Sequence, residues 1–97
     1  MLFMIAGHLK PGAEDRLSEF SAEFSEHLGQ PFRHLVIAGA LRDGEGRRKG
    51  YMAFLEADSI ENAERFLRES PYYQAGLYER CEVLRYDVLV GKLEPQA

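Results

Sequence analysis

The sequence predicts an α+β fold in which a four-stranded antiparallel sheet carries two helices on one face. The first observation is length, because 97 residues suit a single domain. The second is order, since apolar runs and helical patterns follow one another as strand, helix, strand, strand, helix and strand. The third is a glycine-rich, charged segment that joins the middle strands as a hairpin. This order is the ferredoxin-like βαββαβ plan. We expect one domain over residues 1–97, with a core over about 2–90 and a C-terminal tail over 91–97.

The first half of the chain predicts a strand, a helix and a second strand. Residues 2–9 form a short apolar run before Pro11-Gly12, which is typical of a strand followed by a turn. A helix is expected over 17–28, because apolar residues recur there at spacings of three and four. These residues are Leu17, Phe20, Phe24 and Leu28. Gly29 closes the helix, Pro31 prevents its continuation, and RHLVIAGAL (33–41) predicts the next strand.

The second half predicts a hairpin, a helix and the closing strand. The tip of the hairpin is RDGEGRRKG (42–50), and the returning strand is YMAFLEA (51–57). Asp58 or Ser59 is expected to cap the second helix, because short polar side chains accept hydrogen bonds from the first helical amides. The run CEVLRYDVLV (81–90) predicts the last strand.

The segment SPYYQAG (70–76) connects the second helix to the last strand. Pro71 suits the first turn of a short helix, and Gly76 is free to take a left-handed conformation that turns the chain. Tyr72 and Tyr73 supply large packing areas, each with a hydroxyl group. They are interpreted either as a structural corner packed against the sheet or as part of the lining of a small-molecule pocket.

Composition disfavours several classes of function. The net charge of -4 argues against nucleic-acid binding, because such proteins usually present a basic face. Arg47, Arg48 and Lys49 form the only basic cluster and are typical of a solvated loop. Cys81 is the sole cysteine, which excludes an internal disulfide and a cysteine-based zinc site. No signal peptide and no membrane-spanning run is recognised, so we expect a soluble cytoplasmic protein without membrane contact. No histidine spacing predicts a metal, and no phosphate-binding loop predicts a cofactor.

The predicted strands are apolar on both faces, although two helices cover only one face of a sheet. Along a strand, successive side chains point to opposite faces. The opposed sets are Phe3 and Ile5 against Leu2, Met4 and Ala6; Leu35 and Ile37 against Val36 and Ala38; and Tyr51 and Leu55 against Met52 and Phe54. Strands that are apolar on both faces need cover on both. We therefore expect a homodimer joined sheet to sheet.

Several stretches carry a resemblance to a known family. They are Glu56-Ala57-Asp58-Ser59 between a strand and a helix, Ser70-Pro71-Tyr72, Ala75-Gly76-Leu77-Tyr78 before the last strand, and RHLVIAGAL, which resembles a family strand that ends in Ala-Gly-Pro. Over residues 33–90 the chain resembles the YciI-like (YCII-related) proteins of the dimeric α/β-barrel superfamily. The resemblance implies a ferredoxin-like dimer. It also implies a pocket between sheet and helices that holds a histidine–aspartate pair, in a family generally regarded as proposed enzymes.

Two positions depart from that family pattern. The family's histidine usually lies on the first helix in a His-Leu-x-x-Leu setting, and counting back from Ala38-Gly39 places it at Ala22. Ala40 stands where the family favours proline. His27, on the same helix, is the natural substitute for the missing histidine if the register of the helix differs.

The candidate catalytic residues are His27 and Asp43. A partly buried histidine can act as a general base because its pKa lies near neutrality, and Asp43 could orient it across the pocket. The alternatives are that His27 ends a helix and that Asp43 is only a turn residue beside Gly44. The candidate substrate-binding residues are His8, Arg42, Tyr72 and Tyr73.

Three functions follow from these residues and the resemblance. The first is a cofactor-independent isomerase or lyase that moves a proton on a small aromatic or lactone-like compound. The second is a non-catalytic dimeric module that binds a small molecule, which the alanine at position 22 favours. The third is a cofactor-free monooxygenase on the same fold. Fold alone does not decide among them.

Overall fold

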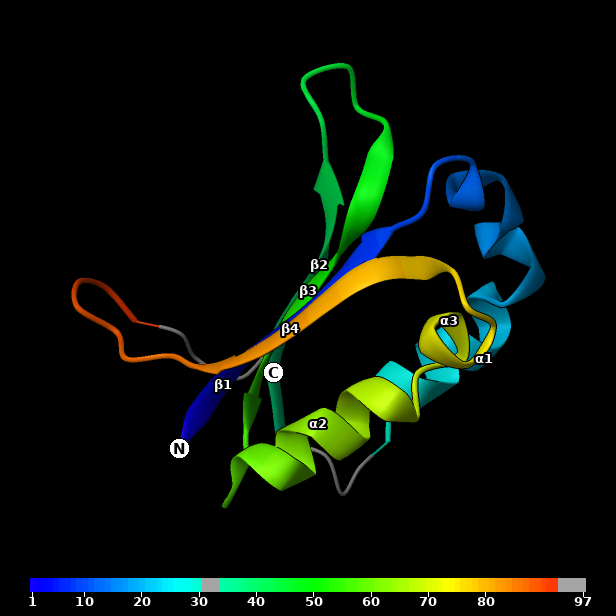
Figure 1. The fold of residues 1–97 in the computed structure, drawn as a ribbon. Helices are drawn as coiled ribbons and strands as arrows, with labels where there is room; N and C mark the ends of the chain where they lie inside the picture. Colours follow the sequence, from blue (N-terminus) through cyan, green and yellow to red (C-terminus); the bar gives the residue numbers. More distant parts are fainter. Residues whose placement is uncertain (31–33, 93–97) are drawn as a thin grey trace.

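The structure is a computed structural model that describes residues 1–30 and 34–92. Its elements are β1 (Leu2–Leu9), the 3₁₀ helix η1 (Ala13–Glu19), α1 (Ser21–Leu28), β2 (His34–Arg42), β3 (Arg48–Glu56), α2 (Ile60–Arg68), α3 (Pro71–Gln74) and β4 (Tyr78–Arg85). The strands form one antiparallel sheet in the order β2-β3-β1-β4. This is the predicted ferredoxin-like architecture, and Figure 1 shows the helices gathered on one side of the sheet. Pro31, Arg33 and the last five residues, which belong to predicted elements, lie outside the described residues.

The core lies between the sheet and α2. The strands and α2 contribute buried apolar side chains to one cluster: Phe3, Ile5, Ala53, Leu55, Ala63, Phe66 and Leu67. α2 begins as predicted, because the side chain of Ser59 accepts a hydrogen bond from the amide of Asn62 at 3.2 Å. We call this side of the sheet the covered face.

A second cluster fills the end of the sheet where η1, α1 and α3 meet. It contains Leu9, Ala13, Leu17, Tyr72 and Leu77. The ring of Tyr72 stacks on that of Phe24, with ring centroids 4.2 Å apart, and this contact joins α3 to α1. Gly76 takes the predicted left-handed conformation, with φ of 72°, and turns the chain into β4.

The first helix differs from the single helix expected over 17–28. A 3₁₀ helix ends at Glu19, Phe20 leaves the helical region with φ of -123°, and α1 starts at Ser21. Both kinds of helix bring apolar residues together at a spacing of three, so the apolar pattern does not reveal where the 3₁₀ helix gives way to the α-helix. The break lets η1 and α1 follow the rim of the sheet as two short pieces, which Figure 1 shows.

The bounds of the hairpin strands and of the last strand also differ from the predicted ones. The strand β2 is shifted by one residue, from 33–41 to 34–42, and β3 begins three residues earlier than predicted, so the hairpin turn spans only 43–47. β4 runs from Tyr78 to Arg85 instead of over 81–90. The last rung joins the amide of Tyr86 to the carbonyl of Leu2, the first residue of β1, at 2.9 Å. The segment beyond it leaves the sheet (Figure 1) with Leu89 and Val90 exposed.

Two bulges break the simple alternation along the edge hairpin. Leu35 pairs with Leu55 while Ile37 pairs with Phe54, so Val36 is the extra residue in β2. The prediction that Leu35 and Ile37 share a face is therefore wrong, because a bulge reverses the alternation that follows it. In β3, Gly50 pairs with Leu41 and Arg48 with Arg42, which makes Lys49 the extra residue.

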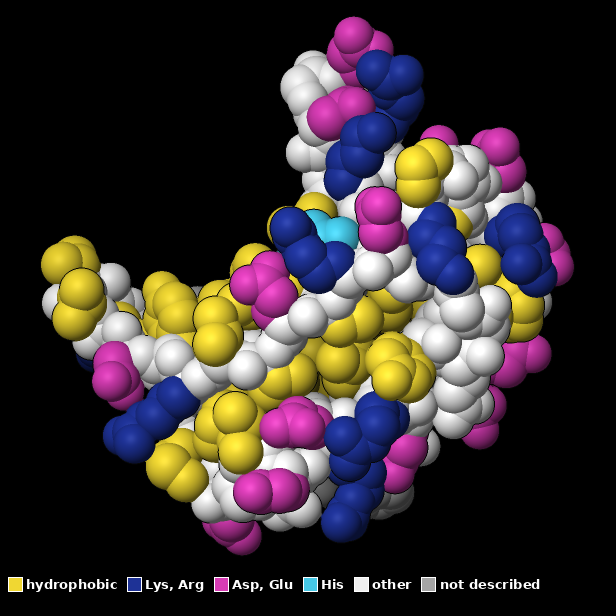
Figure 2. Space-filling view, viewed as in Figure 1, with side chains coloured by type: hydrophobic (Ala, Val, Ile, Leu, Met, Phe, Trp, Pro, Cys, Tyr) yellow, Lys and Arg dark blue, Asp and Glu magenta, His cyan; other side chains and the backbone are white. Residues whose placement is uncertain are grey.

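The face opposite the helices, which we call the open face, is also apolar. Strand pairing assigns to it Leu2, Met4, Ala6, Ile37, Met52, Phe54 and Leu84. Ile37 is 39% exposed and Leu84 is 52% exposed, while the ring of Phe54 packs edge-on against Tyr86 with centroids 4.8 Å apart. Figure 2 shows hydrophobic side chains on the open face beside β4 and on the segment after β4.

No helix within the described residues is both long and apolar enough to cross a bilayer.

Candidate functional site

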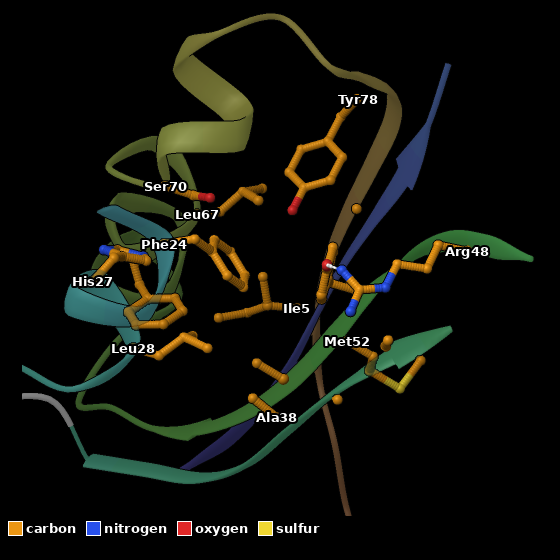
Figure 3. A pocket seen from close by; sticks show the side chains of 16 residues that line it. Ile5, Phe24, His27, Leu28, Ala38, Arg48, Met52, Leu67, Ser70 and Tyr78 are labelled. Atoms are coloured by element: carbon orange, nitrogen blue, oxygen red, sulfur yellow. Dashed lines mark hydrogen bonds between the residues drawn. The ribbon is translucent and has the colours of Figure 1, made fainter. Parts of the chain in front are cut away.

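A cavity of about 250 Å³ lies between the covered face and the helices α1 and α2 (Figure 3). Its wall is mainly apolar, with side chains from the sheet and both helices: Ile5, Phe24, Leu28, Ala38, Ala53, Phe66 and Leu67. A cavity of about 150 Å³ can hold benzene, so this one has room for a small substituted ring. Polar groups reach it from His27, Arg48, Tyr51, Ser70 and Tyr78.

His27 is the candidate catalytic residue that the fold places in this cavity. It lies in the last turn of α1, is only 4% exposed, and lines the cavity beside Leu28. Its ring packs against Phe66 with centroids 4.4 Å apart. Ala22, the position reached by counting from the β2 strand, is exposed on α1 and does not line the cavity. The residue of α1 that stands in for the family histidine at this cavity is therefore His27.

Arg48 lies on the opposite side of the cavity from His27 in Figure 3, and Tyr51 lines the same cavity. An Nη1 hydrogen of Arg48 donates to the hydroxyl of Tyr51, and the guanidinium carbon lies 5.6 Å from the Tyr51 ring centroid. The bulge at Lys49 produces this arrangement, since it moves Arg48 onto the face that carries Tyr51. The sequence assigned Arg48 to a solvated loop, so this residue was missed.

Ser70 and Tyr78 supply two further hydroxyl groups. Ser70 is 4% exposed, and its Oγ has no hydrogen-bond partner within the described part of the chain. The ring of Tyr78 lies over Gly7 so closely that a methyl group there would come within 2.6 Å of it. Burial raises the pKa of the Tyr78 phenol, and the nearby Ser70 hydroxyl partly opposes that rise. Figure 3 shows both oxygens directed toward the same part of the cavity.

Asp43 and Arg42 lie in the β2–β3 hairpin, and neither lines the cavity. Asp43 Oδ1 accepts hydrogen bonds from the amides of Glu45 at 2.9 Å and Arg47 at 3.0 Å. The Arg47 amide is the main reason why the pKa of this carboxyl is lowered. An Nη1 hydrogen of Arg42 donates to the carbonyl of Gly46 at 2.8 Å. The structure thus does not bring Asp43 to His27, and the contacts of Asp43 are those of a turn residue.

The remaining candidates also lie outside the cavity. His8 belongs to the open face, where its Nε2 lies 3.2 Å from Oε1 of Glu82. Tyr72 is a core residue, 1% exposed, whose hydroxyl donates to the carbonyl of Leu17 at 3.5 Å. Burial, followed by the neighbouring Tyr51 phenol, raises the pKa of Tyr72 to about 12. Tyr73 is 40% exposed. For Tyr72, these contacts support the structural interpretation.

Residues that could hold a metal ion are not gathered at the cavity. Within residues 1–30 and 34–92, no group of three or more His, Cys, Asp or Glu side chains lies close enough together to bind one. No Asp or Glu occurs among the described residues that line the cavity. The polar groups present there are one imidazole, one guanidinium and three hydroxyls, which can bind oxygens and exchange protons.

Solved structures with similar folds cover nearly the whole chain. A 5-chloro-2-hydroxyhydroquinone dehydrochlorinase (TftG) from Burkholderia phenoliruptrix, in complex with 2,5-dihydroxybenzoquinone, matches with a TM-score of 0.81 and 22% identity over 90% of this chain and 94% of that one. A protein of unknown function from Nitrosomonas europaea matches with a TM-score of 0.58 and 17% identity, covering 98% and 94%. A proposed antibiotic biosynthesis monooxygenase from Bacteroides thetaiotaomicron matches with a TM-score of 0.55 and 17% identity, covering 99% and 95%. At these identities the likeness establishes the fold alone.

The sequence itself identifies the family. No curated protein matches the chain. The family model of the YCII-related domain matches residues 1–87, which include every strand and helix of the fold and every residue that lines the cavity. The chain belongs to the YCII-related family.

Proposed function

We propose that the protein is a cofactor-independent lyase or isomerase that moves a proton on a small aromatic compound bound beside His27. The observation that carries this proposal is a nearly buried histidine in an apolar cavity of a size suited to one substituted ring. In such surroundings water is displaced by the substrate, and an imidazole with a pKa near neutrality can accept a proton and return it.

The proposed chemistry needs only one proton-transfer group. In an isomerisation, His27 takes a proton from one carbon or oxygen of the ring system and a proton is returned at another, so the composition of the compound is unchanged. In an elimination, His27 takes the proton while an anionic group such as chloride leaves. The electron pair of the broken bond to hydrogen then forms the new double bond. Neither reaction requires an oxidant or a reductant.

The similar dehydrochlorinase supports the choice of substrate class. That protein acts on a chlorinated hydroxyhydroquinone and was crystallised with a dihydroxybenzoquinone. Both compounds are single rings with several oxygen substituents, and the cavity of this chain offers room and hydroxyl groups for such a ring. Hydroxyquinols and hydroxyquinones are accordingly the substrates we propose to try first.

A specific observation also favours the second candidate, a non-catalytic module that binds the same kind of ring. None of the described residues that line the cavity is an Asp or Glu, whereas the family resemblance implies a histidine–aspartate pair in the pocket. A site of this kind still binds a ring through its apolar wall and its hydroxyls. The cofactor-free monooxygenase remains as the third candidate, and a requirement for oxygen separates it from the others.

The experiment is an incubation with 5-chloro-2-hydroxyhydroquinone under nitrogen, in which chloride release is followed. We expect release by the wild-type protein and a loss of about 100-fold or more in His27→Gln, in line with the usual contribution of a general base. His34→Gln, at an exposed histidine that begins β2, is the matched control and should behave as wild type. Binding of the ring without chloride release or isomerisation would favour the module, and turnover only in air would favour the monooxygenase.

The homodimer is part of the same proposal. The open face carries a continuous set of apolar side chains on all four strands, and no helix of the described chain covers it. A two-fold pairing of sheets covers this face with an identical one. Burial of ~1,000 Å² of apolar surface corresponds to a gross gain of about 25 kcal/mol, of which association takes back about 10 kcal/mol or more. The surplus is enough for a tight dimer.

A further inference from the structure

The polar end of the cavity contains an arginine with no acidic partner, in contrast to the basic residues on either side of it. Arg47 pairs with Asp43 at 3.2 Å and with Glu45 at 2.8 Å, and Lys49 approaches Asp43 at 3.9 Å. Arg48 forms no ion pair with any carboxylate of the described residues, and it contacts the ring and the hydroxyl of Tyr51.

This contrast indicates a site for an anion. Arginine stays protonated at every accessible pH and carries five N–H donors in a planar fork. Its contact with Tyr51 uses Nη1, so donors remain for a ligand oxygen. Arg48 is half-buried at the edge of an apolar cavity, where its charge is poorly solvated and attracts a negative group more strongly than it would in water.

A second polar point lies at the Ser70 and Tyr78 hydroxyls. The Oγ of Ser70 is buried and makes no hydrogen bond of standard geometry in the described chain, and the Tyr78 phenol is its polar neighbour. A ligand oxygen placed there could complete the hydrogen bonding of both hydroxyls. The Tyr78 hydroxyl lines the same cavity, and Figure 3 shows its oxygen directed into the cavity on the side of Arg48, with Ile5 and Phe24 forming the apolar wall beside them. A planar ring with oxygens on opposite sides could meet both points at once.

We propose that Arg48, with the hydroxyl of Tyr51, binds an ionised oxygen of the ligand while Ser70 and Tyr78 bind a second oxygen across the ring. The substrate class of the site is then an acidic hydroxylated ring that is already ionised near neutral pH, such as a hydroxyquinone, and not a neutral phenol or ether. This inference rests on the proposed function for the location of the site, but it concerns recognition and not proton transfer. It makes Arg48 the residue that determines the charge of the accepted ligand.

The test uses 4-nitrophenol, a single ring that is about half ionised near neutrality and whose ionised form absorbs visible light. Its nitro group supplies the second acceptor. With the buffered pH set to the midpoint of the ligand's ionisation, added wild-type protein should raise the phenolate absorbance, because binding of the ionised form draws the equilibrium toward it. The neutral ether 4-nitroanisole should bind at least about tenfold more weakly.

The variants are Arg48→Gln and Arg48→Lys, with Arg47→Gln as the matched control one residue away. Arg48→Gln should lose the rise in absorbance and bind 4-nitrophenol about tenfold more weakly or worse, because a hydrogen bond to a charged group is lost. Arg48→Lys should keep the preference for the ionised form with reduced affinity, and Arg47→Gln should match wild type. Far-ultraviolet circular dichroism of each variant checks the fold.

The second point is tested with Ser70→Ala and Tyr78→Phe, against Tyr73→Phe at an exposed tyrosine as control. Each of the first two should weaken binding about threefold or more while keeping the absorbance rise at saturation, because Arg48 is intact. The proposal is overturned if wild type binds neither ring, if 4-nitroanisole binds as tightly as 4-nitrophenol, or if both Arg48 variants retain wild-type affinity. Loss of proton transfer with intact Arg48-dependent binding would remove the proposed enzyme and leave this subsite standing.

Discussion

Both faces of the sheet are mainly apolar, but the few polar side chains on them differ in whether they have a partner within the described chain. On the covered face, Arg48 reaches the cavity without an acidic partner in the described chain, and the buried Ser70 hydroxyl has only the Tyr78 phenol as a polar neighbour there. On the open face, the histidine that projects from β1 is satisfied by Glu82 at 3.2 Å, and apolar side chains continue across the strands. This difference agrees with the proposals that the covered face binds a ligand and that the open face pairs with a second apolar surface.

The largest expected effect comes from a charge on the open face. Phe54→Glu places a carboxylate in the middle of β3, close to its counterpart if two copies pair about a two-fold axis. Burial of an unpaired charge costs several kcal/mol, so we expect a wild-type mass near twice 11.1 kDa at low micromolar concentration and a monomeric mass for the variant. Sedimentation velocity gives both masses.

The control for this change is Ser25→Glu, which adds the same charge at an exposed position on α1. It should leave the dimer intact. A wild-type protein that sediments as a monomer, or a Phe54→Glu variant that remains dimeric, would mean that the open face is not the contact between copies.

A smaller effect is expected from crowding the covered face. In Gly7→Ala the new methyl group would meet the ring of Tyr78 at 2.6 Å, so the ring must move and overpacking should cost about 1–3 kcal/mol of unfolding free energy. The matched control is Gly39→Ala in β2, where a methyl group meets no atom within 4 Å. Urea denaturation of both variants measures the difference. Equal stability of the two would show that Tyr78 is free to move aside and does not form a fixed wall.

The buried phenols of the covered face should make the protein sensitive to alkali. The pKa of Tyr72 is raised in the folded state from 10.0 to about 12, and the pKa of Tyr78 is raised as well. A raised pKa means that the folded state holds its proton longer, so this stability is complete below pH 10 and is lost as the pH rises from 10 toward 12.

Thermal melts at pH 9 to 11 check this dependence. Wild type should lose melting temperature faster above pH 10 than Tyr72→Phe, which has no phenol to ionise there. Tyr86→Phe, at a tyrosine that is 40% exposed, is the control and should follow the wild-type curve. An identical pH dependence in Tyr72→Phe and wild type would contradict the assignment of Tyr72 to a dry core.

The smallest effect belongs to the hairpin turn (43–47), which belongs neither to the cavity nor to the open face. Asp43→Ala removes the acceptor for two turn amides and should lower the melting temperature slightly, without changing ligand binding. Because the pKa of Asp43 is lowered in the fold, its contribution is present above about pH 4 and disappears as the pH falls below that value. Asp43→Asn, which keeps a side-chain oxygen, should retain most of the stability. A large loss of ligand affinity in Asp43→Ala would restore the predicted pairing with His27.

Local signals in the sequence were sufficient for the order of elements and for several of their ends. The cap at Ser59, the short helix opened by Pro71 and the left-handed Gly76 each follow from the chemistry of one residue, and all three are confirmed. The bulges at Val36 and Lys49 could not be predicted in the same way, because a bulge is a property of two paired strands. Alternation along one strand gives no sign of it.

The site was predicted less well for the same reason. His27 was identified as the substitute for the histidine that the family resemblance implies on the first helix, and in the structure it lines the cavity. Arg48 was taken for a loop residue, since only the bulge at Lys49 moves it into the cavity. Ser70 was quoted as part of a motif without a role, because its burial depends on the packing of α2, α3 and β4 around it. Sequence reasoning found the residue whose position follows from its own helix, and it missed the two whose positions depend on strand pairing or on the packing of helices against the sheet.

Exchange of ring protons for deuterium tests the central claim, that His27 moves a proton inside the covered-face cavity, most directly. 2,5-Dihydroxybenzoquinone is dissolved in buffered deuterium oxide, and the loss of its ring-proton signal is followed by nuclear magnetic resonance with and without protein. Wild type and His34→Gln should accelerate the exchange, while His27→Gln should bring the rate close to that of buffer alone, a loss of about 100-fold or more in the protein-dependent rate. Exchange that is equally fast with His27→Gln and wild type, or no acceleration by wild type at all, would contradict the account.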